Sequence, residues 1–135
     1  MDFKEKKENL AHLSPKELSD ILVLLGDWLP VARQVVSIKA AFSKKPIDRE
    51  YLEKNLKENL TIDEYVEWKQ CGPYSLIVGE VHDQLKKLVD EGDSKIAKNL
   101  GKIALDIGEQ TSELLAEPDY WEMGLEELRE WLKLD

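Results

Sequence analysis

The five prolines of this chain separate stretches in which apolar residues recur at the spacing of an α-helix. The first proline lies in Ser14-Pro15-Lys16-Glu17, a pattern typical of the start of a helix. The serine side chain accepts a hydrogen bond from a free backbone N–H, and the glutamate carboxylate is stabilised by the positive end of the helix. No stretch alternates apolar and polar residues as a half-buried strand does. The sequence therefore predicts an all-α protein, an irregular bundle of about five main helices.

The other prolines and caps set the helix boundaries in the first half. Pro30 kinks or restarts the helix that begins at Pro15, because proline lacks the N–H of a helical hydrogen bond. Asp48 caps the next helix after Pro46. The capping box at 61–64 opens a short helix, which we expect to end in a turn at 71–73 (Cys-Gly-Pro).

Three longer helices are expected in the second half. The first covers 73–91 and stops at Gly92, since glycine alone adopts the left-handed conformation without penalty. Its expected inward residues are Leu76, Ile77, Val81, Leu85 and Leu88. Asp93 caps a helix over 94–116, and an amphipathic C-terminal helix covers 118–135.

Composition limits both the domain count and the partners. Hydrophobic residues make up 42% of the 135 positions, enough for one core. We therefore expect a single helical domain over 1–135, with 1–13 as a frayed N-terminal helix. The 28 acidic residues outnumber the 19 basic ones, and the net charge of -9 repels nucleic acid. A protein partner with a basic surface suits this charge better.

Apolar runs and cysteine count bear on location. The longest clean apolar run, 21–25, is far shorter than the ~20 residues that a membrane span needs. Cys71 is the single cysteine, so the chain forms no internal disulfide, and the charged first residues lack an export signal. These features predict a cytoplasmic protein without a membrane partner.

Two acidic pairs suggest a metal site. Glu64 and Glu67 lie one turn apart, as do Glu80 and Asp83, and the turn at 71–73 would fold their helices antiparallel. Converging carboxylates suit Mg²⁺. The spacing resembles the metal motif of the MazG-type nucleotide pyrophosphohydrolases, a resemblance that implies Mg²⁺ on these four residues and hydrolysis of a nucleoside triphosphate. Two solvated helix faces are the alternative, since E-x-x-E recurs elsewhere in this chain.

Small residues follow one face of the helix over 94–116. Ala97, Gly101, Ala104 and Gly108 recur every three or four positions. Each interior glycine costs up to ~1 kcal/mol relative to alanine, which the close approach of another helix offsets. We expect this seam to pack centrally within the bundle, with a homodimer seam as the second interpretation and a ligand groove as the third.

The C-terminal segment combines aromatic and acidic residues, and aromatic side chains anchor many protein interfaces. The residues assigned to a partner-binding surface are Tyr120, Trp121, Glu126, Glu127, Glu130 and Trp131. The alternative is that the two tryptophans hold this helix onto the bundle.

These patterns favour a non-catalytic interaction protein without a cofactor, such as an adaptor, an inhibitor or an immunity-type protein. Phosphate-binding loops, nucleophile motifs and Cys/His zinc patterns are absent from the sequence. The first alternative is the Mg²⁺-dependent pyrophosphohydrolase. The second is a homo-oligomeric structural component built on the small-residue seam.

Overall fold

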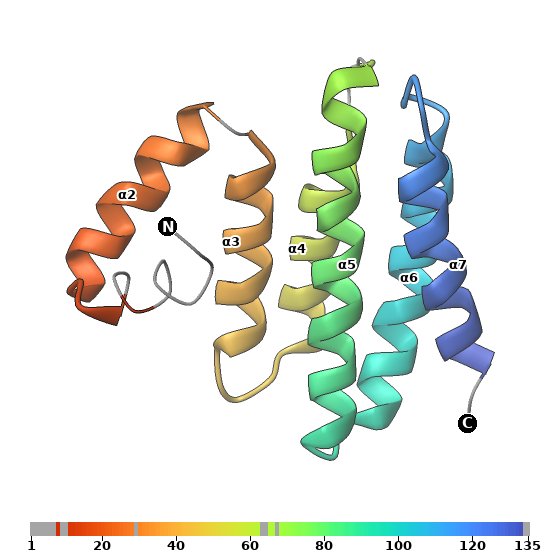
Figure 1. Ribbon diagram of the computed structural model, residues 1–135. Coiled ribbons are helices and arrows are strands. Elements are labelled where there is room, and N and C mark those ends of the chain that lie inside the picture. Colours follow the sequence, from red (N-terminus) through yellow and green to blue (C-terminus); the bar gives the residue numbers. More distant parts are fainter. Residues whose placement is uncertain (1–7, 9–10, 29, 63–64, 67, 134–135) are drawn as a thin grey trace. The chain divides into compact units, whose positions relative to one another are not determined.

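Figure 1 shows a computed structural model of the chain, which describes residues 8, 11–28, 30–62, 65–66 and 68–133. Its helices are α2 (Pro15–Trp28), α3 (Pro30–Ser43), α4 (Arg49–Leu60), α5 (Trp68–Asp90), α6 (Ser94–Ser112) and α7 (Asp119–Lys133). Among these residues there is no strand longer than a single bridge. The predicted all-α fold class is confirmed.

The chain divides into two compact units between residues 33 and 34, inside α3. The first unit contains α2 and the start of α3, and the second contains the rest of α3 with α4 to α7. Most of the frayed helix predicted over 1–13 lies outside the described residues. The single domain over 1–135 stays a prediction.

In the first unit, α2 begins with the predicted capping box. The backbone N–H of Ser14 donates to Glu17 Oε1 at 3.1 Å, and the N–H of Glu17 donates to Ser14 Oγ at 3.1 Å. These bonds from Ser14 hold the pKa of Glu17 below its ordinary value. One helix ends at Trp28 and another begins at Pro30, so the predicted restart at this proline is confirmed.

In the second unit, α6 packs against α4, α5 and α7, while α5 also packs against α7 and α4. Figure 1 shows α5 and α7 running in the same direction, with α6 antiparallel to both. Its largest fully buried side chains include Trp121, Ile38, Leu52, Leu56, Leu60, Ile77, Leu85, Leu100 and Leu128. The apolar stripes of five helices therefore form one core in this unit.

Caps and turns fix the helix ends in this unit. Asp48 accepts hydrogen bonds from the first backbone N–H groups of α4, as predicted. Gly92 has a φ of 96°, and its N–H donates to the carbonyl of Val89 at 3.0 Å, while Asp93 N–H donates to that of Leu88 at 2.8 Å. The predicted stop at Gly92 is confirmed. Asp93 stands at the N-cap of α6, although its side chain makes no capping bond.

The turn predicted at 71–73 is wrong, because α5 runs without interruption from Trp68 to Asp90. Pro73 is exposed and close to the start of α5, where it removes a single helical hydrogen bond, to residue 69. A continuous buried stripe, which includes Cys71 and Ile77, stabilises the helix on both sides of it. The inward position predicted for Leu76 is also wrong, since 63% of its surface is exposed.

The end of α6 also differs from the prediction. The helix stops at Ser112 instead of residue 116, and a parallel bridge joins Leu115 to Val66. Val66 N–H donates to Leu114 O at 2.9 Å, and Ala116 N–H donates to Val66 O at 3.0 Å. The second bond occupies the N–H of Ala116, which would otherwise continue the helix by donating to the carbonyl of Ser112. Both bonds also tie the α6–α7 connection to the segment before α5.

None of the described helices combines the length and the unbroken apolar character that a membrane crossing requires.

Candidate functional site

The four carboxylates of the predicted metal site divide between described and undescribed residues. Glu64 and Glu67 lie outside the described residues. Glu80 is buried in α5, where it pairs with Lys39 Nζ at 2.9 Å and accepts a hydrogen bond from Gln84 at 3.0 Å. Asp83, one turn on, is exposed and lies 3.6 Å from Lys86 Nζ. Within the described residues, no group of three His, Cys, Asp or Glu side chains is placed to hold a metal ion.

The predicted metal site depends on a turn at 71–73, which would bring the two acidic pairs together. Residues 68 and 80 lie about 18 Å apart along the continuous α5, since a helix rises 1.5 Å per residue. The antiparallel helix pair expected for the pyrophosphohydrolase site therefore does not form here. Nothing in the described geometry supports Mg²⁺ on Glu80 and Asp83.

The small-residue seam packs inside the chain. Ala97, Gly101, Ala104 and Gly108 are all buried in α6. A Cβ added at Gly101 would lie 2.8 Å from Leu132 Cδ2, and one at Gly108 would lie 2.5 Å from Leu125 Cδ2. Because α7 covers this face, the seam contacts another helix of the same chain, and central packing stays the preferred interpretation. A homodimer would have to use another surface.

The three aromatic residues assigned to partner binding lie at different depths. Trp121 has no exposed surface, and its indole N–H donates to Gly108 O at 2.8 Å, so it holds α7 onto α6. Tyr120 is 66% exposed. Trp131 is half-buried beside His82. Only Tyr120 and Trp131 are therefore accessible to a partner.

A larger acidic surface was not predicted from the sequence. The stretch 103–128, from the middle of α6 into α7, contains no Lys, Arg or His. Its eight acidic residues are all exposed, and we call them the acidic α6–α7 surface: Asp106, Glu109, Glu113, Glu117, Asp119, Glu122, Glu126 and Glu127. The sequence does contain a signal for this surface, namely a long stretch without a basic residue in a chain that elsewhere mixes acidic and basic residues.

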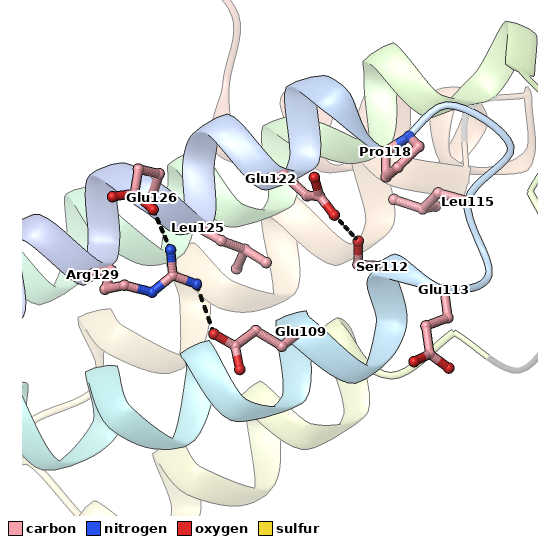
Figure 2. A pocket seen from close by; sticks show the side chains of 9 residues that line it. All are labelled: Glu109, Ser112, Glu113, Leu115, Pro118, Glu122, Leu125, Glu126 and Arg129. Atoms are coloured by element: carbon pink, nitrogen blue, oxygen red, sulfur yellow. Dashed lines mark hydrogen bonds and ion pairs between the residues drawn. The ribbon is translucent and has the colours of Figure 1, made fainter.

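A hollow with a volume of about 650 Å³ lies in this surface between α6 and α7. Figure 2 shows the side chains that line it. Leu125 points into it, and Leu115 and Pro118 form its apolar end near the α6–α7 connection. Its polar lining residues are Glu109, Ser112, Glu113, Glu122, Glu126 and Arg129. The hollow therefore combines a small apolar wall with four carboxylates and one guanidinium.

Arg129 fills one end of this hollow. Its Nη2 lies 2.7 Å from Glu109 Oε1 on α6, and its Nη1 bonds Glu126 on its own helix (Figure 2). The hydrogen bond to Glu109 is the main reason that the pKa of Arg129 is raised above its ordinary value. At the other end, Glu122 accepts a hydrogen bond from Ser112 at 2.9 Å. Neither Glu122 nor Glu113 forms an ion pair with a described residue.

A second depression, which we call the α5–α7 groove, lies on the other side of α7 and has a volume of about 600 Å³. It is lined by His82 and Lys86 from α5 and by Met123, Glu126, Glu127, Glu130 and Trp131 from α7. Most of its accessible wall is apolar, in contrast to the acidic hollow. Glu126 belongs to both depressions, so α7 forms the ridge between them.

Aromatic contacts make the floor of the α5–α7 groove. The rings of His82 and Trp131 meet edge to face with centroids 5.6 Å apart. Lys98 Nζ lies 4.2 Å from the Trp131 ring centroid and donates to the Trp131 carbonyl at 2.8 Å. Trp131 is thus held by α5 and α6 while one part of its ring stays accessible.

Burial keeps His82 in its neutral form. Desolvation is the main reason that its pKa is lowered from 6.5, and the charge of Lys86 lowers it further, while Asp83 and Glu127 act in the opposite direction. Its Nε2 atom is buried and has no hydrogen-bond partner among the described residues. The imidazole of His82 therefore adds little positive charge to the floor of the α5–α7 groove near neutral pH.

Lysines gather away from the acidic surface. Lys95, Lys98 and Lys102 line a depression at the start of α6. Another depression, between α3 and α5, is lined by Lys39, Lys45 and Lys87. The two ends of α6 thus differ in charge.

Comparison of the chain with protein-family models, with curated proteins and with solved structures gives no match. The spacing that resembles the MazG-type pyrophosphohydrolases has no matching family model beside it. The function of the protein is therefore inferred from its own residues and their arrangement.

Proposed function

We propose that this protein is a non-catalytic helical interaction module, of the adaptor, inhibitor or immunity type, that binds another protein with a basic surface. The acidic α6–α7 surface is the observation that carries the proposal. Its eight carboxylates are exposed, and no basic residue occurs within the same stretch of sequence. Arg129 pairs with two of these carboxylates, Glu109 and Glu126, and a basic partner would offset the negative charge of the others.

The geometry of the acidic hollow supports this choice of partner. The chain's own Arg129 inserts its guanidinium between Glu109 and Glu126. Glu113, at the end of α6, and Glu122, on the first turn of α7, lie nearer the α6–α7 connection, without an ion pair to a described residue. An arginine or lysine of the partner would complete this second end, with its aliphatic stem along Leu115 and Pro118.

We also propose a reducing compartment, most simply the cytoplasm. Cys71 is buried in α5, and its thiol donates to the carbonyl of Val66 at 3.6 Å. A single buried cysteine suits a compartment in which thiols stay reduced.

A charge reversal with a matched control tests the proposed binding surface. The full chain serves as bait in extracts of the native cell, as wild type, as Glu113→Lys/Glu122→Lys and as Glu50→Lys/Glu58→Lys. The control pair lies on α4, is equally exposed and makes the same change in net charge. Circular dichroism and thermal unfolding establish that all three baits are folded.

We expect the wild type and the α4 control to retain the same basic partner, with affinities within about twofold. The Glu113/Glu122 reversal should bind it at least tenfold more weakly, because cations then face the cations of the partner. Equal retention by both double variants would overturn the proposal, as would a wild type that retains no partner at all.

A further inference from the structure

The α5–α7 groove presents apolar surface that no described part of the chain covers. Met123 is 59% exposed on its wall, although it lies in the middle of α7. Trp131 and His82 form the floor. Methionine side chains adapt to different apolar partners, and tryptophan is enriched among the residues that dominate binding at interfaces.

The rim of the groove is acidic. Glu126, Glu127 and Glu130 line the α7 side, whereas Lys86 is the one cation among the lining residues. Glu126 already bonds Arg129, and Glu130 lies 3.5 Å from Lys133 Nζ. Glu127 has no ion pair with a described residue, so its charge is available to a partner.

The floor is suited to an apolar side chain. His82 contributes an aromatic edge to the contact with Trp131. Its pKa is lowered by burial, so the ring carries no charge near neutral pH. An apolar side chain placed against this ring would not have to remove water from a charged imidazole.

We infer, on the basis of the proposed function, that the α5–α7 groove receives an amphipathic basic helix of the partner protein. A large apolar side chain of that helix lies between His82, Met123 and Trp131, and its lysines or arginines lie over Glu127 and its acidic neighbours. The groove thus supplies the apolar anchor and the acidic α6–α7 surface supplies the long-range attraction.

A helix lying alongside α7 fits both the length and the acidic rim of the groove. Met123 and Trp131 stand about 12 Å apart along α7, which equals roughly two helical turns of a partner lying alongside it. The rim acids Glu126 and Glu130 recur at one-turn spacing, as cations do on one flank of an amphipathic helix. Nucleic acids and anionic membranes are disfavoured, because their phosphates would face these carboxylates.

Two synthetic peptides test the groove directly. The first is a helical peptide with leucines on one face and lysines and arginines on its flanks. The second replaces each leucine by serine, which keeps the charge and removes the apolar face. Each is titrated into the isotope-labelled full chain and followed by NMR at the amides of residues 82–86 and 123–131 and at the indole N–H of Trp131.

We expect the leucine peptide to shift these signals saturably and to bind at least tenfold more tightly than the serine peptide. Equal affinity of both peptides, or leucine-peptide shifts confined to the acidic hollow, would overturn the inference.

Substitutions at Met123 separate the apolar anchor from charge attraction. Met123→Glu adds a carboxylate at an exposed position, so charge alone would strengthen binding of a basic peptide. We expect it instead to weaken binding of the leucine peptide at least fivefold, while Met123→Leu binds within about twofold of wild type. Unchanged or tighter binding by Met123→Glu would show that the groove is not the anchor.

The two proposals fail in different ways. If the captured partner is lost with Glu113→Lys/Glu122→Lys but bound normally by Met123→Glu, the interaction function stands and the groove assignment is wrong. If the partner is indifferent to the Glu113/Glu122 reversal, the proposed acidic surface is wrong.

Discussion

At the glycines of α6, a hydrogen atom in place of a methyl group sets how closely α7 can pack. Gly108 lies against the buried side chain of Leu125. The carbonyl of Gly108 accepts a hydrogen bond from the indole N–H of Trp121. Gly101 lies against Leu132, which is only half-buried. A larger side chain should therefore be tolerated less well at Gly108 than at Gly101.

Alanine substitutions at two glycines should change stability in opposite directions. Gly79 is exposed in the middle of α5, and an added Cβ would meet nothing within 4 Å. Gly79→Ala should therefore raise the free energy of unfolding by about 0.5–1 kcal/mol, from helix propensity alone. Gly108→Ala should lower it by about 1–2 kcal/mol, because overpacking against Leu125 exceeds the propensity gain. Urea unfolding measures both, and a stabilised Gly108→Ala would contradict the α6–α7 packing.

His82 should make stability depend on pH. Its pKa is lowered on folding, so the unfolded chain takes up the proton first, and stability falls as the pH drops below the unfolded value of 6.5. Above pH 6.5 the imidazole is mostly neutral in both the folded and the unfolded chain, so the stability no longer changes with the titration of His82. The charges that face His82 are Asp83 and Lys86 from α5 and Glu127 from α7.

The difference in unfolding free energy between wild type and His82→Gln, measured from pH 8 to pH 5, isolates this effect. This difference should stay constant above about pH 7. Below pH 6.5 the free energy of unfolding of the wild type should fall relative to that of the variant. A difference that is flat throughout, or that shifts in favour of the wild type, would contradict the burial of this imidazole.

At the scale of elements, local sequence signals predicted helix ends better than helix continuity. Ser14, Asp48 and Gly92 act through hydrogen bonds to neighbouring residues, so their roles could be read directly from the sequence. The turn at Cys71-Gly72-Pro73 was predicted from equally local signals. It is wrong because the buried face of α5, which depends on contacts with distant helices, outweighs one lost hydrogen bond.

The candidate site was predictable only in part, for the same reason. The helical face that carries Glu126, Glu127 and Glu130 follows from the periodicity of α7. That Trp121 lies inside while Trp131 lines a groove depends on the neighbouring α5 and α6, which a single-helix pattern does not contain. The acidic hollow likewise requires two helices and the Arg129–Glu109 pair between them.

Replacing Pro73 tests the continuity of α5. Pro73→Ala restores a backbone N–H in an exposed position of the helix, so the free energy of unfolding should rise by about 1 kcal/mol. Hydrogen exchange should show slower exchange of the amides around residue 73. If the segment were instead a turn with proline at the first position of a new helix, the substitution would be neutral or destabilising.

At the scale of the molecule, charge is distributed unevenly. Residues 103–128 carry eight acids without a cation, whereas the first half of α6 contains Lys95, Lys98 and Lys102. Such a distribution orients an approaching partner before contact and speeds association. Apolar contact in the α5–α7 groove would then slow dissociation.

Salt should therefore act mainly on the association rate. Between 0.05 and 0.5 M NaCl, we expect the association rate constant with the basic partner or the leucine peptide to fall at least tenfold. The added salt shortens the Debye length and so screens the charges of the two molecules from each other before contact. The dissociation rate constant should change by less than threefold. Surface plasmon resonance separates the two, and a salt effect confined to dissociation would contradict steering by the acidic α6–α7 surface.

Photocrosslinking in the native cell tests most directly whether α7 and its neighbours form the contact surface. A photoreactive phenylalanine analogue replaces Met123 in the α5–α7 groove or, as a control, Tyr51, which is exposed on α4. We expect position 123 to crosslink one basic protein through a lysine- or arginine-rich amphipathic helix, and position 51 to give no such product. A partner captured from position 51 alone, or a product at position 123 whose linked segment is acidic, would contradict this account.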